Sequence, residues 1–421
     1  MPNQQQTQRS NTYVRIAKEL DISPALFERA KISYESVGAF LNKRFKSATI
    51  YPQGSFALGT VVRPVTDRDD YDLDLVCEIP EMMGESARKL KCVVGEELKA
   101  YTETYNINNE PEEKNRCWQM VYTDNANFHM DIIPALPELR ANISMFVGIN
   151  ESLSSPQYVD AIAITDTNVD EDDNEYDYIG SNPKGYKEWF DNQKLVAYNE
   201  AKFTLFENND TRYDSIEEVP DHVIKTPLQQ AIQILKRHRD IMYAEGSGKN
   251  KPISIIITTL AARAYNNESN LYDALNNILQ YMPNYIEEIN GVYYVDNPSY
   301  EGENFADKWN THPERRNEFY IWLRAARVDL LIALTENRTR MDQVDNLKKS
   351  LGKGIVERAV LSEAGEVQAA NANKEIFISP TGMISTTKGE GSIHNAKSNK
   401  HYGTIQKQII ANFCGKSSFR Y

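Results

Sequence analysis

Two aspartates separated by one leucine interrupt an apolar run at residues 71–79, whose sequence is YDLDLVCEI. Side chains of a β-strand alternate between its two faces, so Asp72 and Asp74 share one face while Leu73, Leu75 and Cys77 share the other. Two carboxylates this close raise each other's proton affinity unless a cation neutralises them. The run therefore predicts a strand with one face in an apolar core and one acidic face suited to a hard divalent cation.

A second apolar run, FHMDII at residues 128–133, repeats this arrangement with a single aspartate. His129 and Asp131 are expected on one face of this strand, and Phe128 and Met130 on the other. Three carboxylates from Asp72, Asp74 and Asp131 would suit two Mg²⁺ ions about 3.5–4 Å apart, which activate an attacking hydroxyl and stabilise a leaving pyrophosphate. His129 would either orient a ligand or serve as a structural histidine, and both interpretations stay open.

The segment Gln53-Gly54-Ser55 precedes the first of these runs and has the composition of a turn. Its glycine allows backbone amides to approach a ligand, and its serine adds a hydroxyl donor, so the turn could cradle phosphate oxygens. A Gly-Ser pair alone is usually only a turn, and an Asp-x-Asp pair alone is usually a solvated strand face. The conjunction of both with a third aspartate is much rarer and indicates phosphate chemistry.

The remaining chain divides into a mixed first half and a helical second half. After a polar leader, Ser23 and Pro24 predict the capped start of a long helix, residues 49–80 and 118–133 contain strands, and residues 85–105 are helical. The pattern is helical from about Thr226 nearly to Asn346, and the polar residues 364–404 predict a loosely packed or looped tail. We expect an α+β chain with a catalytic lobe at 1–205, a helical lobe at 206–346 and a polar C-terminal segment at 347–421 that packs on or extends from the helical lobe.

Composition limits the partners of such a chain. With 47 Lys and Arg against 60 Asp and Glu, the net charge is −13, which argues against strong binding to nucleic acid. The four cysteines lack metal-site spacing, and the apolar stretches at 253–260 and 328–334 are shorter than the roughly 20 residues of a membrane span. The amino terminus has no apolar signal region. We expect a cytoplasmic protein with reduced thiols and no membrane contact.

The constellation of turn and acids resembles the DNA polymerase β-like nucleotidyltransferases. It is more similar to the CD-NTases of bacterial anti-phage (CBASS) systems, which are relatives of cyclic GMP-AMP synthase and oligoadenylate synthase. Four other stretches add to the resemblance, which runs from about residue 26 to 335: NPKGYKEWF (182–190), LKRHRD (235–240), KPISIIITTL (251–260) and NPSYEGENFADKW (297–309). It implies a nucleotidyltransferase core, with a mixed sheet flanked by helices, a mostly α-helical second lobe and an active-site cleft between them.

The resemblance also implies roles for individual residues. Gly54 and Ser55, with Gln53 beside them, would contact phosphates. Asp72 and Asp74 would bind metal. Asp131 would be the third metal ligand and the carboxylate on the general-base side of the reaction. Lys236 and Ser254 would reach the phosphates of the donor nucleotide. Two Mg²⁺ ions are the implied cofactors, with Mn²⁺ as a substitute. The sixteen residues between Ser55 and Asp72 are more than compact versions of the pattern have, so the intervening loop is where this chain departs from them.

The residues themselves leave two of these roles open. Lys236 lies at the edge of an apolar helical stripe, where its ammonium would extend into a cleft or into solvent. Ser254 follows Pro252 at a helix start, where a serine commonly caps. The tripeptide His238-Arg239-Asp240 spells a kinase motif, but the rest of that motif is missing. We interpret it as a helix surface.

The leading hypothesis is a synthase that joins ATP, GTP or both into a cyclic di- or trinucleotide and releases pyrophosphate. The resemblance implies that a separate effector protein reads this product in anti-phage defence, and that regulatory or conjugating partner proteins act on the synthase. One alternative is template-independent addition of nucleotides to RNA 3′ ends, which the net charge disfavours. The other is a catalytically silent nucleotide-binding protein, which the intact acids disfavour.

Overall fold

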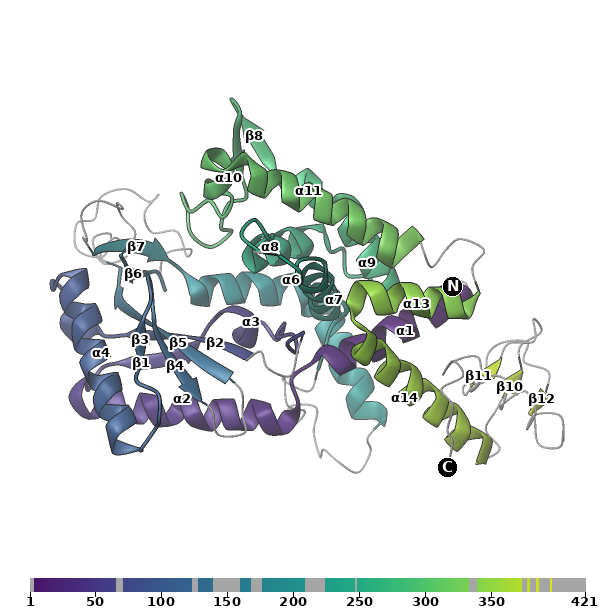
Figure 1. Ribbon diagram of the computed structural model, residues 1–421, viewed down its shortest axis with the longest axis horizontal. Helices are drawn as coiled ribbons and strands as arrows, with labels where there is room; N and C mark the ends of the chain where they lie inside the picture. Colours follow the sequence, from purple (N-terminus) through teal and green to yellow (C-terminus); the bar gives the residue numbers. More distant parts are fainter. Residues whose placement is uncertain are drawn as a thin grey trace. The chain divides into compact units, whose positions relative to one another are not determined.

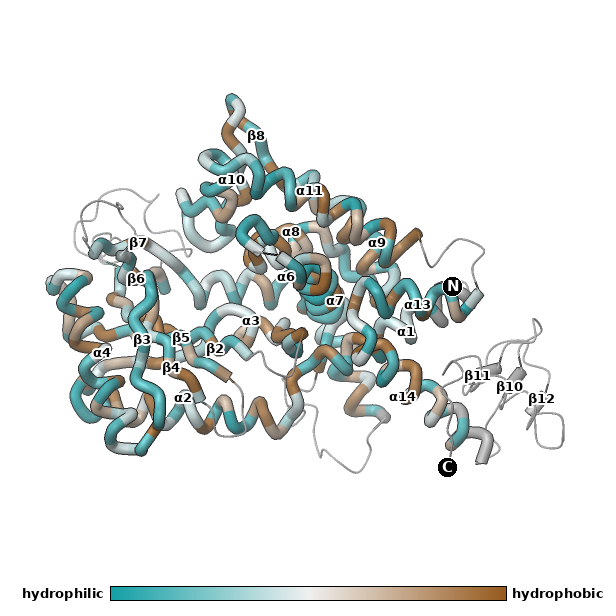
Figure 2. Tube along the Cα trace, viewed as in Figure 1, coloured by the Kyte–Doolittle hydropathy of each residue, from teal (hydrophilic) through white to brown (hydrophobic). Residues whose placement is uncertain are grey.

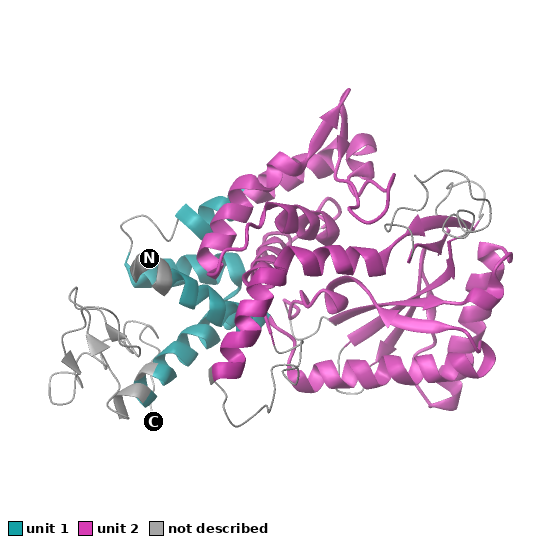
Figure 3. Ribbon diagram, turned by 180° about the vertical axis from the view of Figure 1, so that it is seen from behind, with its two compact units in different colours: residues 1–20, 324–421 teal, residues 21–323 magenta. Residues whose placement is uncertain are grey.

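The computed structural model describes residues 4–65, 71–122, 128–138, 160–167, 176–208, 224–246, 248–332, 339–372 and three short strand pieces beyond. Contacts group the chain into two compact units, residues 1–20 with 324–421 and residues 21–323 (Figure 3). This grouping places the first twenty residues with the C-terminal part. The domain boundaries at residues 205 and 346 stay predictions.

A seven-stranded mixed sheet forms the centre of the larger unit in the part of the chain that is described (Figure 1). Five strands run in the order β1 (Thr49–Pro52), β2 (Tyr71–Glu78), β5 (Phe128–Pro137), β4 (Trp118–Tyr122) and β3 (Glu112–Glu113). The far end of β5 also pairs with β6 (Ile162–Asp166), which pairs with β7 (Asp177–Ser181). β2 and β5 are parallel neighbours, whereas β1 and β4 run antiparallel to them. The predicted strands at 71–79 and 128–133 are thus adjacent.

One face of this sheet is the main apolar core. It buries Leu73, Leu75 and Cys77 of β2 against α2 (Pro24–Arg44) and α4 (Ala87–Thr104), as the alternation in the sequence predicted. Burying each large aliphatic side chain contributes about 1.5–3 kcal/mol. Ser23 accepts a hydrogen bond from the backbone of Leu26 and Pro24 opens α2, so the predicted helix start is confirmed. Along α2, hydrophilic and hydrophobic segments follow one another, as in an amphipathic helix (Figure 2).

Helices dominate the rest of the larger unit. They are α6 (Pro183–Asn208), α7 (Pro227–Met242), α8 (Ser254–Ala264), α9 (Leu271–Tyr281), α10 (Asp307–Thr311) and α11 (Pro313–Arg327), with 3-10 turns at Pro80–Met82 and Met282–Tyr285. The prediction of continuous helical pattern is wrong at one place, where β8 (Glu287–Ile289) and β9 (Val292–Tyr294) form a hairpin. The α+β fold class is otherwise as predicted, with a mixed sheet and a helical second part.

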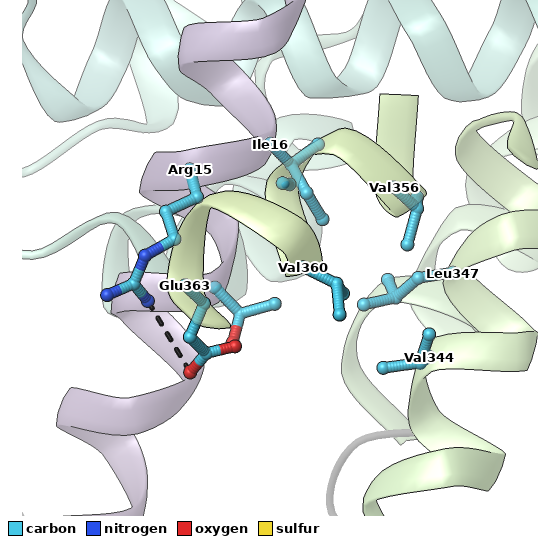
Figure 4. A pocket seen from close by; sticks show the side chains of 9 residues that line it. Arg15, Ile16, Val344, Leu347, Val356, Val360 and Glu363 are labelled. Atoms are coloured by element: carbon cyan, nitrogen blue, oxygen red, sulfur yellow. Dashed lines mark ion pairs between the residues drawn. The ribbon is translucent and has the colours of Figure 1, made fainter. Parts of the chain in front are cut away.

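The smaller unit packs α1 (Gln4–Leu20) against α14 (Lys353–Ala372) and includes η6 (Val328–Ile332) and α13 (Arg340–Leu351). Figure 4 shows Ile16, Val344, Leu347, Val356 and Val360 around a common apolar space, with an ion pair between Arg15 and Glu363 at its rim. The segment described from its composition as a polar leader is thus the helix α1, which buries one face in this bundle.

The predicted tail starts later than residue 364, since α14 continues to Ala372. Beyond it, β10 (Phe377–Ile378), β11 (Ile384–Ser385) and β12 (His394–Asn395) pair with one another. The rest of the predicted tail lies outside the described residues. No helix in the described ranges combines the length and apolar character that crossing a bilayer requires.

Candidate active site

Two rows of polar side chains cross the open face of the sheet. The parallel register of β2 and β5 pairs Asp74 with Asp131 and Asp72 with His129. Directly opposed residues of neighbouring strands lie on the same face, so the alternation predicted from each run has brought the three carboxylates to one face. Further along, this face becomes apolar, with Val76, Ile133 and neighbours from β6 forming a second cluster. The acids thus occupy the end of the face that contains the starts of β2 and β5.

Asp72 and Asp131 each have a neighbouring side chain as partner. Asp72 is exposed and pairs with Nε2 of His129. Asp131 is half-buried, and its Oδ1 accepts a hydrogen bond of 3.0 Å from Nε2 of Gln119, its register partner on β4. Asp74 is half-buried between them. The three side chains therefore differ in how firmly the protein holds them.

Burial and neighbouring charges change the pKa of Asp74. Burial raises its pKa to about 7, and the charges of Asp72 and Asp131 add to the rise, while Lys236 and His129 oppose it. A carboxylate that two others repel would be stabilised by any cation placed on this face. Burial raises the pKa of the nearby Cys117 thiol to about 12, and Asp131 adds to this rise.

The fit of a divalent metal rests on the chemistry of the donor set. Carboxylate oxygens are the ligands that Mg²⁺ prefers. Such an ion would neutralise the negative charges of Asp72 and Asp131 that repel the carboxylate of Asp74. In the described ranges no three His, Cys, Asp or Glu side chains stand close enough together to form a ready-made metal site, and Asp72 and Asp131 are engaged by His129 and Gln119. The assignment of the three acids as metal ligands stays a prediction.

The predicted phosphate turn lies directly against Asp74. The backbone N–H of Gln53 donates to the carbonyl of Asp74 at 2.8 Å, which extends the pairing of β1 with β2 by one residue. Gly54 then opens the short helix α3 (Gly54–Ala57) with φ +58°, a conformation that favours glycine. A Cβ at this position would come within 2.5 Å of Asp74 Oδ2. Close approach of backbone to carboxylate therefore requires the glycine.

Aromatic packing between α3 and α2 supports the turn. The ring of Phe56 stacks on Phe27 of α2 with centroids 4.8 Å apart. The backbone N–H of Thr60 closes the turn by donating to the carbonyl of Ser55 at 2.9 Å. Gln53, Gly54 and Ser55 are thus brought beside the acidic row, as the sequence predicted.

The two residues predicted on the helical side have partners within the protein. Lys236 of α7 is buried, and its Nζ donates to the carbonyl and hydroxyl oxygens of Thr60 at 3.3 and 3.2 Å. Burial lowers its pKa to about 7, Arg239 lowers it further, and Asp240 and Asp74 oppose the change. Lys236 is therefore tied to the loop that follows the turn and interacts electrostatically with Asp74.

Ser254 is the first residue of α8 and does not cap it, since Ile253 occupies the capping position. Its hydroxyl instead accepts a hydrogen bond of 2.8 Å from Arg239. The interpretation of His238-Arg239-Asp240 as a helix surface is wrong for the first two residues, which are both buried. Arg239 connects Ser254 to the neighbourhood of Lys236.

Sequence reasoning missed Gln119, Cys117 and Arg239. Gln119 lies on β4, and Cys117 directly precedes this strand, two residues before Gln119 in the run CWQMVY. Their position beside Asp131 depended on the pairing of β4 with β5, which no local pattern specifies.

Comparisons with known proteins agree with this geometry. Residues 48–134, which include the turn and all three acids, match the family described as "Cyclic GMP-AMP synthase DncV-like, nucleotidyltransferase domain". A c-di-GMP synthase of Roseivirga ehrenbergii is 29% identical over 324 residues, covering 75% of this chain and 77% of that protein. The cyclic dinucleotide synthase CdnG of Bradyrhizobium diazoefficiens is 24% identical over 366 residues, covering 82% of this chain and 80% of that protein.

Solved structures share the fold. The Bradyrhizobium diazoefficiens CD-NTase CdnG in complex with GTP matches with a TM-score of 0.62 and 22% identity, over 84% of this chain and 99% of that one. CdnC from the Escherichia coli MS115-1 CdnC:HORMA-deltaN complex matches with a TM-score of 0.53 and 14% identity, over 81% of this chain and 96% of that one. The chain thus shares the fold of these CD-NTases, is similar in sequence to two cyclic dinucleotide synthases over most of its length, and matches a nucleotidyltransferase domain at residues 48–134.

Proposed function

We propose that this protein is a Mg²⁺-dependent synthase that joins nucleoside triphosphates into a cyclic dinucleotide and releases pyrophosphate. The observation that carries the proposal is the row Asp74–Asp131, which faces the Gly54–Ser55 turn. GTP is the substrate we expect first, because one relative is a c-di-GMP synthase and CdnG was solved with GTP. Both curated relatives are named for dinucleotides, so a dinucleotide is favoured over a trinucleotide.

The chemistry requires an acceptor ribose hydroxyl to attack the α-phosphorus of a donor triphosphate while pyrophosphate leaves. Asp131 is the carboxylate that we assign to the side of the attacking hydroxyl, with its orientation held by Gln119. Ser55 and the backbone of the turn would bind the donor phosphates. Lys236 would exchange its bonds to Thr60 for phosphate oxygens, and Ser254 would join it from α8.

Mg²⁺ held by Asp72, Asp74 and Asp131 would neutralise negative charge as pyrophosphate departs. The residues of this chain supply the positioning that the reaction needs. Contact of Asp74 with the backbone of Gly54 fixes where the acidic row meets the turn. Reacting groups held in such a geometry gain rate because their orientation entropy is lost before the chemical step.

A biological role follows from this proposal. The product would be an alarm signal of bacterial anti-phage defence that a separate effector protein reads in the cytoplasm. CdnC was solved with a HORMA protein, which supports the expectation of a regulatory partner here. The expected conjugation at the carboxyl terminus concerns GKSSFRY, which lies outside the described residues.

Incubation with radiolabelled triphosphates separates this function from the alternative of RNA tailing. Small nuclease-resistant products formed without any RNA support the synthase, and elongation of an added RNA in their place would refute it. A protein that binds triphosphates but forms neither product would be the catalytically silent alternative.

A further inference from the structure

The loop that follows the phosphate turn is held by its main-chain carbonyl oxygens. Residues 58–63 form no helix or strand beyond a turn at their start, so their carbonyls need partners from elsewhere. Five of them accept hydrogen bonds from long polar side chains: Leu58 from Gln229 (2.9 Å), Gly59 from Lys225 (2.9 Å), Thr60 from Lys236 (3.3 Å), Val61 from Gln233 (2.7 Å) and Arg63 from Arg237 (3.2 Å). We call these five side chains the carbonyl clamp.

Four of the five side chains of the clamp lie on one face of helix α7. Gln229, Gln233, Lys236 and Arg237 follow one another at i, i+4, i+7 and i+8 on α7, which brings them to one side. All four are buried, and Gln233 is only 1% exposed. A buried carbonyl that loses its donor costs about 1–3 kcal/mol, so the polar face of α7 is matched to this loop rather than to solvent.

The conformation and surroundings of Gly59 also fit the close approach of α7 to the loop. Its φ is +65°, and a Cβ there would come within 2.6 Å of Nε2 of Gln229. The glycine removes the side chain that would block the bond from Gln229 to the adjacent carbonyl of Leu58. The backbone of the loop is therefore shaped to receive the side chain of Gln229 from α7.

The same loop holds the turn through its amide groups. The N–H of Leu58 donates to the carbonyl of Gly54 at 3.1 Å, and the N–H of Thr60 donates to that of Ser55 at 2.9 Å. The segment thus binds the turn with its donors and α7 with its acceptors. The loop therefore connects α7 to Gly54 and Ser55 through a continuous set of hydrogen bonds.

We propose that Gln229 and Gln233 are positioning residues that set the phosphate turn of the core at the correct distance from Lys236 and Ser254. This inference rests on the proposed function, because it takes Ser55 and Lys236 to bind one triphosphate from two sides. The glutamines suit the task since their amides do not titrate and donate at every pH. They act through the turn and do not themselves touch the nucleotide.

Two variants remove donors of the clamp in different ways. Gln229 also caps α7, since its Oε1 accepts from the backbone N–H of Thr226, and Gln229→Glu keeps that acceptor while removing the donor to Leu58. Gln233→Met keeps the volume and removes the donor to Val61, together with the bond of the same amide to Asp21 at 3.1 Å, so the two variants share only the loss of a clamp bond. The matched control is Asn277→Leu, which removes a side-chain bond to the carbonyl of Ala264 at the far end of α8.

Amide hydrogen exchange of residues 54–63 and steady-state kinetics with GTP are then measured on the full chain. We expect exchange in this segment to accelerate about tenfold or more, and KM for GTP to rise about tenfold with a smaller change in kcat, in both variants and not in Asn277→Leu. Unchanged exchange in both variants, or equal acceleration in the control, overturns the clamp. If the unmodified protein makes no product from triphosphates, the proposed function fails, while the exchange data still decide whether the clamp holds the turn.

Discussion

The backbone of Gly54 lies directly over the carboxylate of Asp74, so close that a Cβ would come within 2.5 Å of its Oδ2 atom. The turn that is proposed to bind phosphate and the central acid of the row are therefore one structural piece. This contact explains why the turn is a glycine turn, and it couples the two halves of the candidate site without any intervening side chain.

Substitution of Gly54 by alanine is expected to impair the site more than the fold. The left-handed conformation costs an alanine about 1–2 kcal/mol, and the added methyl group displaces Asp74. The control is Gly84→Ala, because Gly84 has φ +90° but no neighbouring atom within 4 Å of the place that an added methyl group would occupy. Chemical unfolding should show similar losses of stability for both, and turnover of triphosphates should fall only in Gly54→Ala. Equal activity of the two variants contradicts the contact's role.

Neutralising the acidic row should abolish activity without unfolding the protein. Asp74→Asn and Asp131→Asn remove mutually repelling charges, and the second keeps an oxygen to accept from Gln119. We expect product formation to fall about a hundredfold or more, and calorimetric titration with Mn²⁺ to show weakened binding. Asp177→Asn on the exposed start of β7 serves as the control and should behave as the unmodified chain. Turnover retained in Asp74→Asn refutes the assignment.

The stability of the metal-free protein should depend on pH through Asp74. Its pKa is raised from 3.8 to about 7, so the folded protein binds more protons than the unfolded chain between these values. The contribution to stability is complete below pH 3.8 and is lost as the pH rises to about 7. Urea unfolding in EDTA should therefore show that the free energy of unfolding falls more from about pH 5 to about pH 8 in the unmodified protein than in Asp74→Asn. Equal losses would mean that Asp74 titrates normally.

Lys236 should make the free energy of unfolding rise with pH in the alkaline range. Its pKa is lowered from 10.5 to about 7, so the unfolded chain binds more protons in this interval. The contribution of Lys236 is present above pH 10.5 and is lost as the pH falls to about 7. Unfolding free energies measured between about pH 7 and about pH 10 should rise less steeply in Lys236→Met. A slope unchanged by this substitution argues against the burial of a charged ammonium.

Gln119 is expected to tune the site through Asp131. Replacing it with leucine removes the 3.0 Å bond that orients the carboxylate, and such supporting contacts are typically worth about 10- to 100-fold in activity or metal affinity. Kinetics at several Mg²⁺ concentrations should show a higher metal requirement. Val121→Ala, two residues along the same strand face, is the control that should keep the original requirement. A Gln119→Leu enzyme with unchanged metal dependence would exclude this positioning role.

Local patterns were sufficient wherever a single strand or turn decides the outcome. The alternation of Asp72, Leu73 and Asp74 correctly predicted which side chains enter the core, because period two is a property of one strand. The hairpin at 287–294 was also encoded locally, by Asn290-Gly291 with both φ values positive, yet the helical pattern around it obscured this signal. Likewise Tyr13, Ile16, Ala17 and Leu20 have helical spacing that the polar composition of the amino terminus concealed.

The remaining features depend on contacts between distant segments. The bond from Gln119 to Asp131 requires the register of β4 with β5, and the two glutamines of the carbonyl clamp bind residues 171 and 172 positions away in the chain. Nothing local distinguishes Gln233 from a glutamine on a solvated helix face. Only the packing of α7 against the 58–63 loop gives its amide a partner.

Mass spectrometry of the products that the purified chain makes from ATP, GTP, CTP and UTP with Mg²⁺ tests the central claim most directly. The account predicts a guanosine-containing cyclic dinucleotide, released with pyrophosphate and missing when Asp131→Asn replaces the unmodified chain. Absence of any nucleotide product from the unmodified chain, or the same product from Asp131→Asn, would contradict it.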